Sequence, residues 1–397
     1  MAKPFPLDGV RILAIEQYGA GPFGTLFFAD QGAEVIKIED PREGGDYSRT
    51  LGPHFLSNGE SQFWHTFNRN KTSVTLDLKT PGGQEIFHKL VKTADGVASN
   101  SRGDVAEKLG LTFKQLKYVN PKIVCAHLSA YGREGSRANW PGFDFLMQAE
   151  AGHFSVTGEP DGPPQRCGLS VVDLAAGLGL AFALAAGIIS SRATGSGCEL
   201  DTSLFHMAHT LNVYTATWYL NSKYIQGRTS RSAHPSLVPC QLFRTSDGWV
   251  YLMCNKQRFW PILCDAIGRR ELADDLRFND FSVRLENRKL LEAILDEVLA
   301  GRTTKEWLTV FAGKVPSAPV HDLKAALESS FVQEQKMLQE IDVPGHGSLN
   351  LLDTPVRSEN NTPLNPAPKL GEHTENVLSE LGYSEKEIKD FRQAKII

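Results

Sequence analysis

The sequence lacks several features that mark particular classes of protein. Its six cysteines among 397 residues never form a C-x-x-C pair, so their spacing excludes the common zinc sites and is typical of reduced thiols. It contains neither an H-E-x-x-H motif nor a P-loop ending in G-K-[ST], so we predict no metal site. The N-terminus shows no continuous apolar segment with a cleavage site, and we therefore expect a cytoplasmic protein.

Charge and hydrophobic patterning narrow the classes further. A net charge of -4 gives no basic excess to neutralise phosphates, so nucleic acid is not expected as a partner. Hydrophobic residues make up 41% and charged residues 22% of a chain long enough for two domains, as in ordinary globular proteins. The apolar run from Leu174 to Ile189 is shorter than the roughly 20 residues that a bilayer requires. We expect a buried helix there, and no membrane span.

The opening residues predict a β-α-β unit. Residues 11–15 and 34–39 read as strands and residues 22–31 as a helix between them, which favours a parallel sheet. Residues 19–24 (GAGPFG) match the G-x-G-x-x-G pattern, and Glu39 ends the second strand, so an NAD-dependent oxidoreductase is one hypothesis. Three residues separate the first strand from Gly19, and Pro22 lacks one N–H that would bind a pyrophosphate. A tight strand-to-helix turn is the simpler interpretation.

The next hundred residues continue this alternation. Strands are predicted at 74–78, 95–99 and 122–128, and helices at 85–93 and 105–109. Polar and basic side chains at 68–73 and 100–103, and the glycine-marked loop 129–135, flank these strands. In open α/β sheets ligands bind at the carboxyl ends of strands. A ligand site is therefore expected at the loop 129–135, whereas the side chains at 68–73, which precede a strand, could bind phosphate or adenine but more commonly form a solvated loop.

A single carboxylate, Asp173, stands at the head of the long apolar run. At or near the N-cap of a helix it would have free backbone N–H groups and the positive end of the helix dipole beside it. We expect that setting to keep the carboxylate ionised at neutral pH. The segment alone favours a simple capping role.

Read together, these segments resemble the family III CoA-transferases, the CaiB/BaiF type that includes formyl-CoA transferase and carnitine CoA-transferase. The motifs that carry the resemblance run through nearly the whole chain: GAGPFGTLFFADQGAEVIKIEDP, NRNKTSVTLDLKTPGGQ, SAYGREG, PGFDFLMQAEAG, TGEPDGPP, SVVDLAAG, RATGSGCELDTSLF and PAPKLGEHTENVL. Their order and spacing are more specific than any one of them.

The resemblance implies a fold and an assembly. The fold class is α/β, with a large Rossmann-like parallel-sheet domain built from both chain ends and a smaller inserted α+β domain. The expected ranges are 1–229 and 326–397 for the large domain and 230–325 for the small one. It also implies two chains interlocked as a homodimer, which composition does not reveal.

The resemblance further implies an activity. The enzyme would move CoA from an acyl-CoA donor to a carboxylic acid acceptor, with Asp173 as the nucleophile. The coenzyme A thioester would be a co-substrate, with no tightly bound cofactor. The segment around 233–239 (AHPSLVP) resembles branches that use succinyl-CoA and dicarboxylic acids, which makes a dicarboxylate acceptor our hypothesis.

The expected binding residues follow from the matching loops and from side-chain chemistry. Those expected to bind CoA are Lys71, Asn100, Arg102 and Lys108. Those expected to bind the acid substrates are Gln17, Arg49, Arg166 and His234, because arginine pairs bidentately with carboxylates.

A second enzyme class shares this fold, the 2-methylacyl-CoA racemases. They place a histidine directly before the aspartate of a G-x-D segment and a glutamate on the small domain. Here Phe143 precedes Asp144, and Asn255 or Lys256 stands near the expected glutamate. Neither phenylalanine nor asparagine transfers protons at neutral pH, so the residues favour a transferase.

Overall fold

The computed structural model describes residues 5–359 and 362–397. The chain forms two compact units. The first comprises the residues up to Ala151, then Gly168–Val213 and Gln335–Ile397; the second comprises Gly152–Cys167 and Tyr214–Glu334. The domain ranges expected from the sequence stay predictions, and each unit is taken here by itself.

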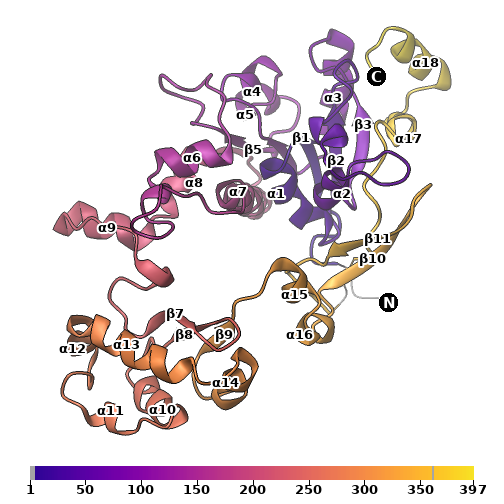
Figure 1. The fold of residues 1–397 in the computed structure, drawn as a ribbon. Helices are drawn as coiled ribbons and strands as arrows, with labels where there is room; N and C mark the ends of the chain where they lie inside the picture. Colours follow the sequence, from indigo (N-terminus) through magenta and orange to yellow (C-terminus); the bar gives the residue numbers. More distant parts are fainter. Residues whose placement is uncertain (1–4, 360–361) are drawn as a thin grey trace. The chain divides into compact units, whose positions relative to one another are not determined.

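A six-stranded parallel sheet forms the centre of the first unit (Figure 1). Its strands are β1 (Arg11–Ile15), β2 (Glu34–Glu39), β3 (Thr72–Thr75), β4 (Gly96–Ser99), β5 (Val124–Ser129) and β6 (Cys198–Ser203). The order is β3-β2-β1-β4-β5-β6, and every neighbouring pair is parallel. This confirms the predicted α/β class. Strand order reverses between β1 and β4, where open sheets of this type bind ligands.

Alternating strand residues supply two separate cores, one on each face of the sheet. Leu13 and the strand residues on the same face of the sheet pack with α3 (Pro81–Val91) and with the C-terminal helices α17 (Thr374–Glu380) and α18 (Glu385–Gln393). Ile12 and Ala14 point the other way, toward α1 (Ala20–Ala29) and α7 (Val171–Thr194). Period-two alternation of apolar residues on doubly covered strands produces this layering.

The two helices on that second face, α1 and α7, approach through glycines. A β-carbon on Gly24 would lie 2.4 Å from the Gly177 carbonyl oxygen, and one on Gly177 would lie 2.5 Å from the Ala20 carbonyl oxygen. Any side chain at either position would force the helices apart. The glycines therefore set the distance between α1 and α7.

Helix α7 is the one helix within residues 5–359 and 362–397 with the length and apolar composition of a membrane span. Core helices of soluble proteins meet the same criteria, and 44% of its most apolar window is buried within the chain. Leu180 and Leu184 lie in the core, whereas Leu178, Phe182 and Ile189 are exposed on the single chain. The helix thus has one covered face and one apolar face that the chain leaves open.

Short elements complete the first unit. They are a 3-10 turn at Tyr47–Thr50, α2 (Gln62–Asn68), α4 (Val105–Lys108), α5 (Phe113–Leu116), α6 (Asp144–Glu150), α8 (Leu204–Thr210) and the antiparallel hairpin β10 (Leu338–Val343) and β11 (Gly347–Leu352). Neither β6 nor this hairpin was predicted from the sequence.

The second unit is an α+β structure with its own core. Its antiparallel sheet has the order β7 (Cys240–Arg244), β8 (Trp249–Met253) and β9 (Ser317–Pro319). The helices are α9 (Val213–Ser222), α10 (Phe259–Ala266), α11 (Glu271–Asp274), α12 (Phe281–Glu286), α13 (Arg288–Leu299), α14 (Thr304–Phe311), α15 (Leu323–Leu327) and α16 (Ser330–Glu334). Strands β7 and β8 form an antiparallel hairpin that turns at residues 245–248. Helices α12 and α13 are separated at Asn287, which is the C-cap of the first and the N-cap of the second.

Candidate active site

A cavity of about 590 Å³ opens at the carboxyl edge of the parallel sheet, within the first unit. Its walls come from the loops after β1, β4 and β5 and from the first turns of α6 and α7. The lining residues are Gln17, Tyr18, Gly19, Ala20, Phe63, Phe67, Asn100, Ser101, Arg102, Val105, Leu128, Ser129, Ala130, Pro141, Gly142, Phe143, Asp144, Phe145, Ser170, Asp173, Leu174 and Leu204. The cavity therefore lies where the strand order reverses.

Asp173 lies in the first turn of α7, but it does not cap the helix. The N-cap is Ser170, whose side chain makes no capping hydrogen bond. The cap comes from α6 instead: the N–H groups of Val172 and Asp173 donate to Asp144 Oδ2 at 2.7 and 2.9 Å. Because Asp144 takes the capping role, the Asp173 carboxylate is left to face the cavity.

The surroundings of Asp173 favour its neutral form more than the sequence suggested. The side chain is half-buried, and its carboxylate accepts no hydrogen bond from any residue in the described part of the chain. Burial, and secondly the negative charge of Asp144, raise the pKa of Asp173 to about 7. The expectation of a fully ionised carboxylate at neutral pH is thus corrected. A poorly solvated carboxylate with a pKa near the working pH is typical of catalytic groups.

Backbone donors stand beside this carboxylate at the start of α1. A β-carbon on Gly19 would lie 3.9 Å from Asp173 Oδ2. The N–H groups of Gly19, Ala20 and Gly21 find no acceptor among the described residues, as is common in the first turn of a helix. Two of the amides at the start of α7, by contrast, already bond to Asp144. Open donors beside Asp173 are therefore available at the start of α1, and these were not predicted from the sequence.

The glycine pattern at 19–24 is explained by packing rather than by a dinucleotide. A β-carbon on Gly21 would lie 2.7 Å from Asn100 Cγ, and Gly24 touches the backbone of α7. Asn100 in turn donates from Nδ2 to the Gln17 carbonyl at 2.7 Å and accepts from the Gln17 N–H at 2.8 Å. The strand-to-helix turn is therefore fixed by contacts with Asn100, directly after β4, and with α7.

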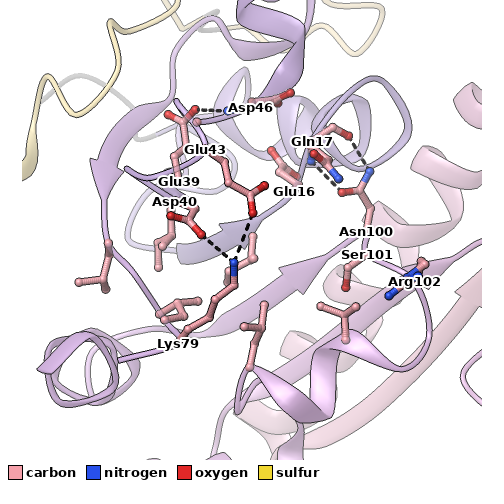
Figure 2. Close-up of a pocket in the computed structure, with 17 residues that line it drawn as sticks. Glu16, Gln17, Glu39, Asp40, Glu43, Asp46, Lys79, Asn100, Ser101 and Arg102 are labelled. Carbon is pink, nitrogen blue, oxygen red and sulfur yellow. Dashed lines mark hydrogen bonds and ion pairs between the residues drawn. The ribbon is translucent and has the colours of Figure 1, made fainter. Parts of the chain in front are cut away.

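A second cavity of about 470 Å³ adjoins the first, sharing Gln17, Asn100, Ser101, Arg102 and Val105 with it. Figure 2 shows its acidic side, where Lys79 reaches Asp40 at 3.0 Å and Glu43 at 3.3 Å. Its remaining lining residues are Ile15, Glu16, Ile38, Glu39, Gly45, Asp46, Leu76, Leu78 and Leu109. The two cavities are therefore neighbours at the sheet edge.

The residues expected to bind CoA fall into different places. Asn100 and Arg102 line both cavities. Lys108 is exposed and pairs with Asp104 at 2.6 Å, outside both linings. Lys71 differs most from the expectation, because its ammonium is fully buried and pairs with Glu16 at 2.8 Å. Lys71 lines neither of these two cavities.

The residues expected to bind the acids also separate. Gln17 lines both cavities and is exposed. Arg49 is mostly buried and already pairs bidentately with Glu39, at 2.8 and 2.7 Å, so its guanidinium is not directed at substrate. Arg166 and His234 belong to the second unit, where Arg166 donates to the Cys167 carbonyl and His234 Nδ1 accepts two backbone N–H groups. Their roles toward substrate stay predictions.

The sequence analysis missed the aromatic lining of the main cavity. Tyr18, Phe63, Phe67, Phe143 and Phe145 contribute rings to it. Tyr18 lies 5.2 Å from the Tyr47 ring and 6.2 Å from the Phe143 ring, between centroids. The residues come from three separate segments, so no local spacing announced them. The Phe143–Asp144 pair was noted only as the place where a racemase would differ.

Comparison with known proteins agrees with this geometry. The sequence profile of the family described as CoA-transferase family III matches residues 7–374. A succinate–glutarate CoA-transferase of Agrobacterium fabrum is 31% identical, covering 96% of each chain. The mouse succinyl-CoA:glutarate CoA-transferase is 32% identical over 95% of this chain and 86% of its own length. A succinyl-CoA:mesaconate CoA-transferase of Haloarcula marismortui is 31% identical over 95% of this chain and 96% of its own.

Solved structures give the same result. A CaiB/BaiF family protein from Brucella suis superposes with a TM-score of 0.80 at 31% identity, covering 96% of this chain and all of that one. The protein Rv3272 from Mycobacterium tuberculosis superposes with a TM-score of 0.84 at 30% identity, covering 94% of this chain and 99% of that one. The chain, with its aspartate at the sheet edge, therefore belongs to CoA-transferase family III.

Proposed function

We propose that this enzyme transfers CoA from succinyl-CoA to a dicarboxylic acid, with Asp173 as the covalent nucleophile. The observation that carries the proposal is the half-buried Asp173 carboxylate, which faces a cavity beside open backbone donors of α1. CoA-transferases use CoA thioesters as co-substrates, and several relatives are named for succinyl-CoA with glutarate or mesaconate.

The first half of the proposed reaction loads the enzyme. An Asp173 oxygen bonds to the thioester carbonyl carbon of the donor, the C–S bond breaks, and CoA leaves as a thiolate. The product is a mixed anhydride between Asp173 and the donor acid. The thiolate then bonds to the aspartyl carbonyl carbon and the donor leaves as a carboxylate, giving an aspartyl-CoA thioester.

The second half repeats these steps in the opposite order. The acceptor carboxylate bonds to the aspartyl carbonyl carbon and releases the thiolate. The thiolate then attacks the acceptor's carbonyl carbon, which yields the new acyl-CoA and the free Asp173 carboxylate. Every tetrahedral intermediate carries an oxyanion, and preorganised N–H donors stabilise such charge strongly. We assign this role to the amides of Gly19, Ala20 and Gly21, because they have no other acceptor in the described chain.

A racemase of the same fold is less well supported. Phe143 lines the cavity where a racemase would need a proton-transferring histidine. Its ring is 57% exposed on the single chain, so it is open to bound ligand but carries no ionisable group. The cavity retains one carboxylate with a raised pKa next to open amides, which suits nucleophilic attack better than proton shuttling.

The dicarboxylate part of the proposal rests on the named relatives. Among the described residues that line the main cavity, Arg102 is the one lysine or arginine. We assign both Arg102 and Asn100 to the binding of CoA. The roles of Arg166 and His234 toward the acid substrates are likewise carried over from the resemblance. These assignments, and a cytoplasmic location, are proposals.

A matched panel of acids tests the substrate class. With succinyl-CoA as donor, glutarate and mesaconate are expected to accept CoA with kcat/KM at least about tenfold above that of pentanoate, because one charge-assisted pair contributes roughly 1.4 kcal/mol or more. New thioesters are quantified by liquid chromatography and mass spectrometry. Exclusive use of monocarboxylic acids would remove the dicarboxylate assignment. The absence of transfer from every donor tested would remove the function itself.

The interlocked homodimer is also part of the proposal. The apolar side chains of Leu178, Phe182 and Ile189 are 47%, 75% and 70% exposed on the single chain. Spacings of four and seven residues put them along one face of α7, and a second copy of the chain would cover that face. Analytical ultracentrifugation is expected to give twice the chain mass. A monomer at micromolar concentration would contradict this.

A further inference from the structure

One buried ammonium connects both ends of the loop that lines the main cavity. Lys71 Nζ donates to Glu16 Oε1 at 2.8 Å and to the Pro22 carbonyl at 2.9 Å, with Asn68 Oδ1 at 3.3 Å. Glu16 precedes the loop and Pro22 follows it. The Lys71 side chain is fully buried. A single charge thus holds the start and the end of residues 17–21, four of which line the cavity.

The middle of the loop is held in an unfavourable conformation by the same cluster. Tyr18 has a φ of 63°, in the left-handed region that a bulky residue rarely adopts. Its N–H donates to Asp46 Oδ1 at 3.1 Å. Asp46 Oδ2 pairs with Lys37 Nζ at 2.8 Å, and Lys37 also donates to the Glu16 carbonyl at 2.9 Å. Strained backbone persists only where surrounding contacts enforce it, and it concentrates at functional sites.

The charges around Lys71 come from three other elements. Glu16 at the end of β1 is the nearest, and it also accepts two contacts from Thr25 Oγ1 of α1, at 2.8 and 2.9 Å. Lys37 on β2 and Asp46 in the following loop complete the group. The side chains of this cluster are all buried: Lys71, Glu16, Thr25, Lys37 and Asp46. Since water does not screen these charges, loss of one charge would change the electrostatic interactions of all the others.

We propose that Lys71 is a positioning residue for the transfer reaction, whose ammonium keeps the amides of Gly19, Ala20 and Gly21 beside Asp173. This inference rests on the proposed function, because those amides are the donors assigned to the oxyanion. Lys71 itself touches no substrate. Its effect passes through Glu16 and Pro22 to the loop between them.

The ionisation of Lys71 makes the arrangement testable. Burial lowers the pKa of Lys71 to about 8, against the raising effect of Glu16, while the charge of Lys37 lowers it further. Below that pH the ammonium is charged and the loop is held. Above it, Lys71 becomes a neutral amine and the pair with Glu16 is lost. The rate of transfer should therefore fall as the pH rises through about 8.

The experiment follows kcat for succinyl-CoA and glutarate from pH 6 to 9.5 in the full-length enzyme. Lys71→Arg carries a charge that does not titrate, so it should remove the descending limb. Glu16→Gln removes the charge that raises the pKa of Lys71, so its descending limb should move to lower pH. Lys71→Met should lower kcat by about 10²-fold, the cost of a small misplacement of catalytic groups, and show no descending limb.

The matched control is Asp30→Asn. It breaks an equally buried ion pair, Arg69 Nη2 to Asp30 Oδ2 at 2.7 Å, which lies outside both cavity linings. This variant should lose thermal stability but keep the wild-type pH profile. Thermal unfolding of each variant separates folding from positioning.

The possible outcomes separate the positioning role of Lys71 from the proposed CoA-transferase function. If wild type transfers CoA and all three variants at positions 71 and 16 keep its descending limb, Lys71 does not position the loop, although the proposed function stands. If Lys71→Arg does not fold, the displacement of the limb in Glu16→Gln decides the question. If the wild-type enzyme transfers CoA from no donor, the proposed function and this inference are both overturned.

Discussion

Asp173→Asn is expected to lower kcat for CoA transfer by at least about 10⁴-fold, while the protein stays folded. An amide oxygen cannot form the anhydride, and removal of a covalent nucleophile has effects of this order or larger in other enzymes. Stability should not suffer, because the carboxylate accepts no hydrogen bond from the described residues and its charge is poorly solvated. The melting temperature should be equal to or higher than that of wild type at pH 8.

The covalent intermediate provides the direct measurement. Wild-type enzyme treated with succinyl-CoA and then hydroxylamine should carry a hydroxamate on the peptide that contains Asp173, and Asp173→Asn should not. Unmodified wild-type peptide, or a variant with more than a small fraction of wild-type activity, would contradict the nucleophile assignment.

The pH dependence supplies the control for this prediction. Because the pKa of Asp173 is raised to about 7, the carboxyl is neutral below that pH, and kcat/KM should rise as the pH increases through it. Asp144→Asn keeps an oxygen for the N–H groups of Val172 and Asp173 but removes the neighbouring negative charge. Its ascending limb should therefore move to lower pH. A limb that does not move would show that Asp144 acts only as a cap.

Gly177→Ala is expected to destabilise the enzyme by about 3 kcal/mol. The added β-carbon would lie 2.5 Å from the Ala20 carbonyl oxygen and 3.2 Å from the Gly24 nitrogen, both backbone atoms of α1. Neither can move without shifting the helix, so the substitution overpacks the α1–α7 contact. Because α1 carries the proposed oxyanion donors, kcat should fall as well. Urea unfolding followed by circular dichroism measures the loss of stability.

The matched control lies two residues further along α7. A β-carbon on Gly179 would meet only the end of the Met207 side chain, at 2.8 Å, and Thr202 Oγ1, at 3.6 Å. Methionine is flexible, and alanine favours a helix over glycine by roughly 0.5–1 kcal/mol. Gly179→Ala should therefore be neutral or stabilising. Equal losses for the two substitutions would mean that the close helix contact does not limit stability.

Much of the fold followed from local pattern. The boundaries of β1 and β2 agree with the prediction because both strands are apolar segments bounded by clear turn residues. The third strand was expected at 74–78 but runs from Thr72 to Thr75. After it, the Asp77 N–H bonds to the carbonyl of Ile396. A partner more than 300 residues away decided where that strand ends, and no local pattern contains it.

The sequence by itself determined the parallel sheet, a ligand edge at the loop after β5, and the presence of one carboxylate at the head of the apolar helix, since these depend on periodicity and on turn residues. Only the tertiary structure decided how that carboxylate is used. Asp144, 29 positions before Asp173, caps the helix in its place. Lys71 is buried and bonds to Glu16 at the start of the loop 17–21. The physical reason is that burial and charge pairing depend on which segments fold together, and neither is encoded in the spacing along the chain.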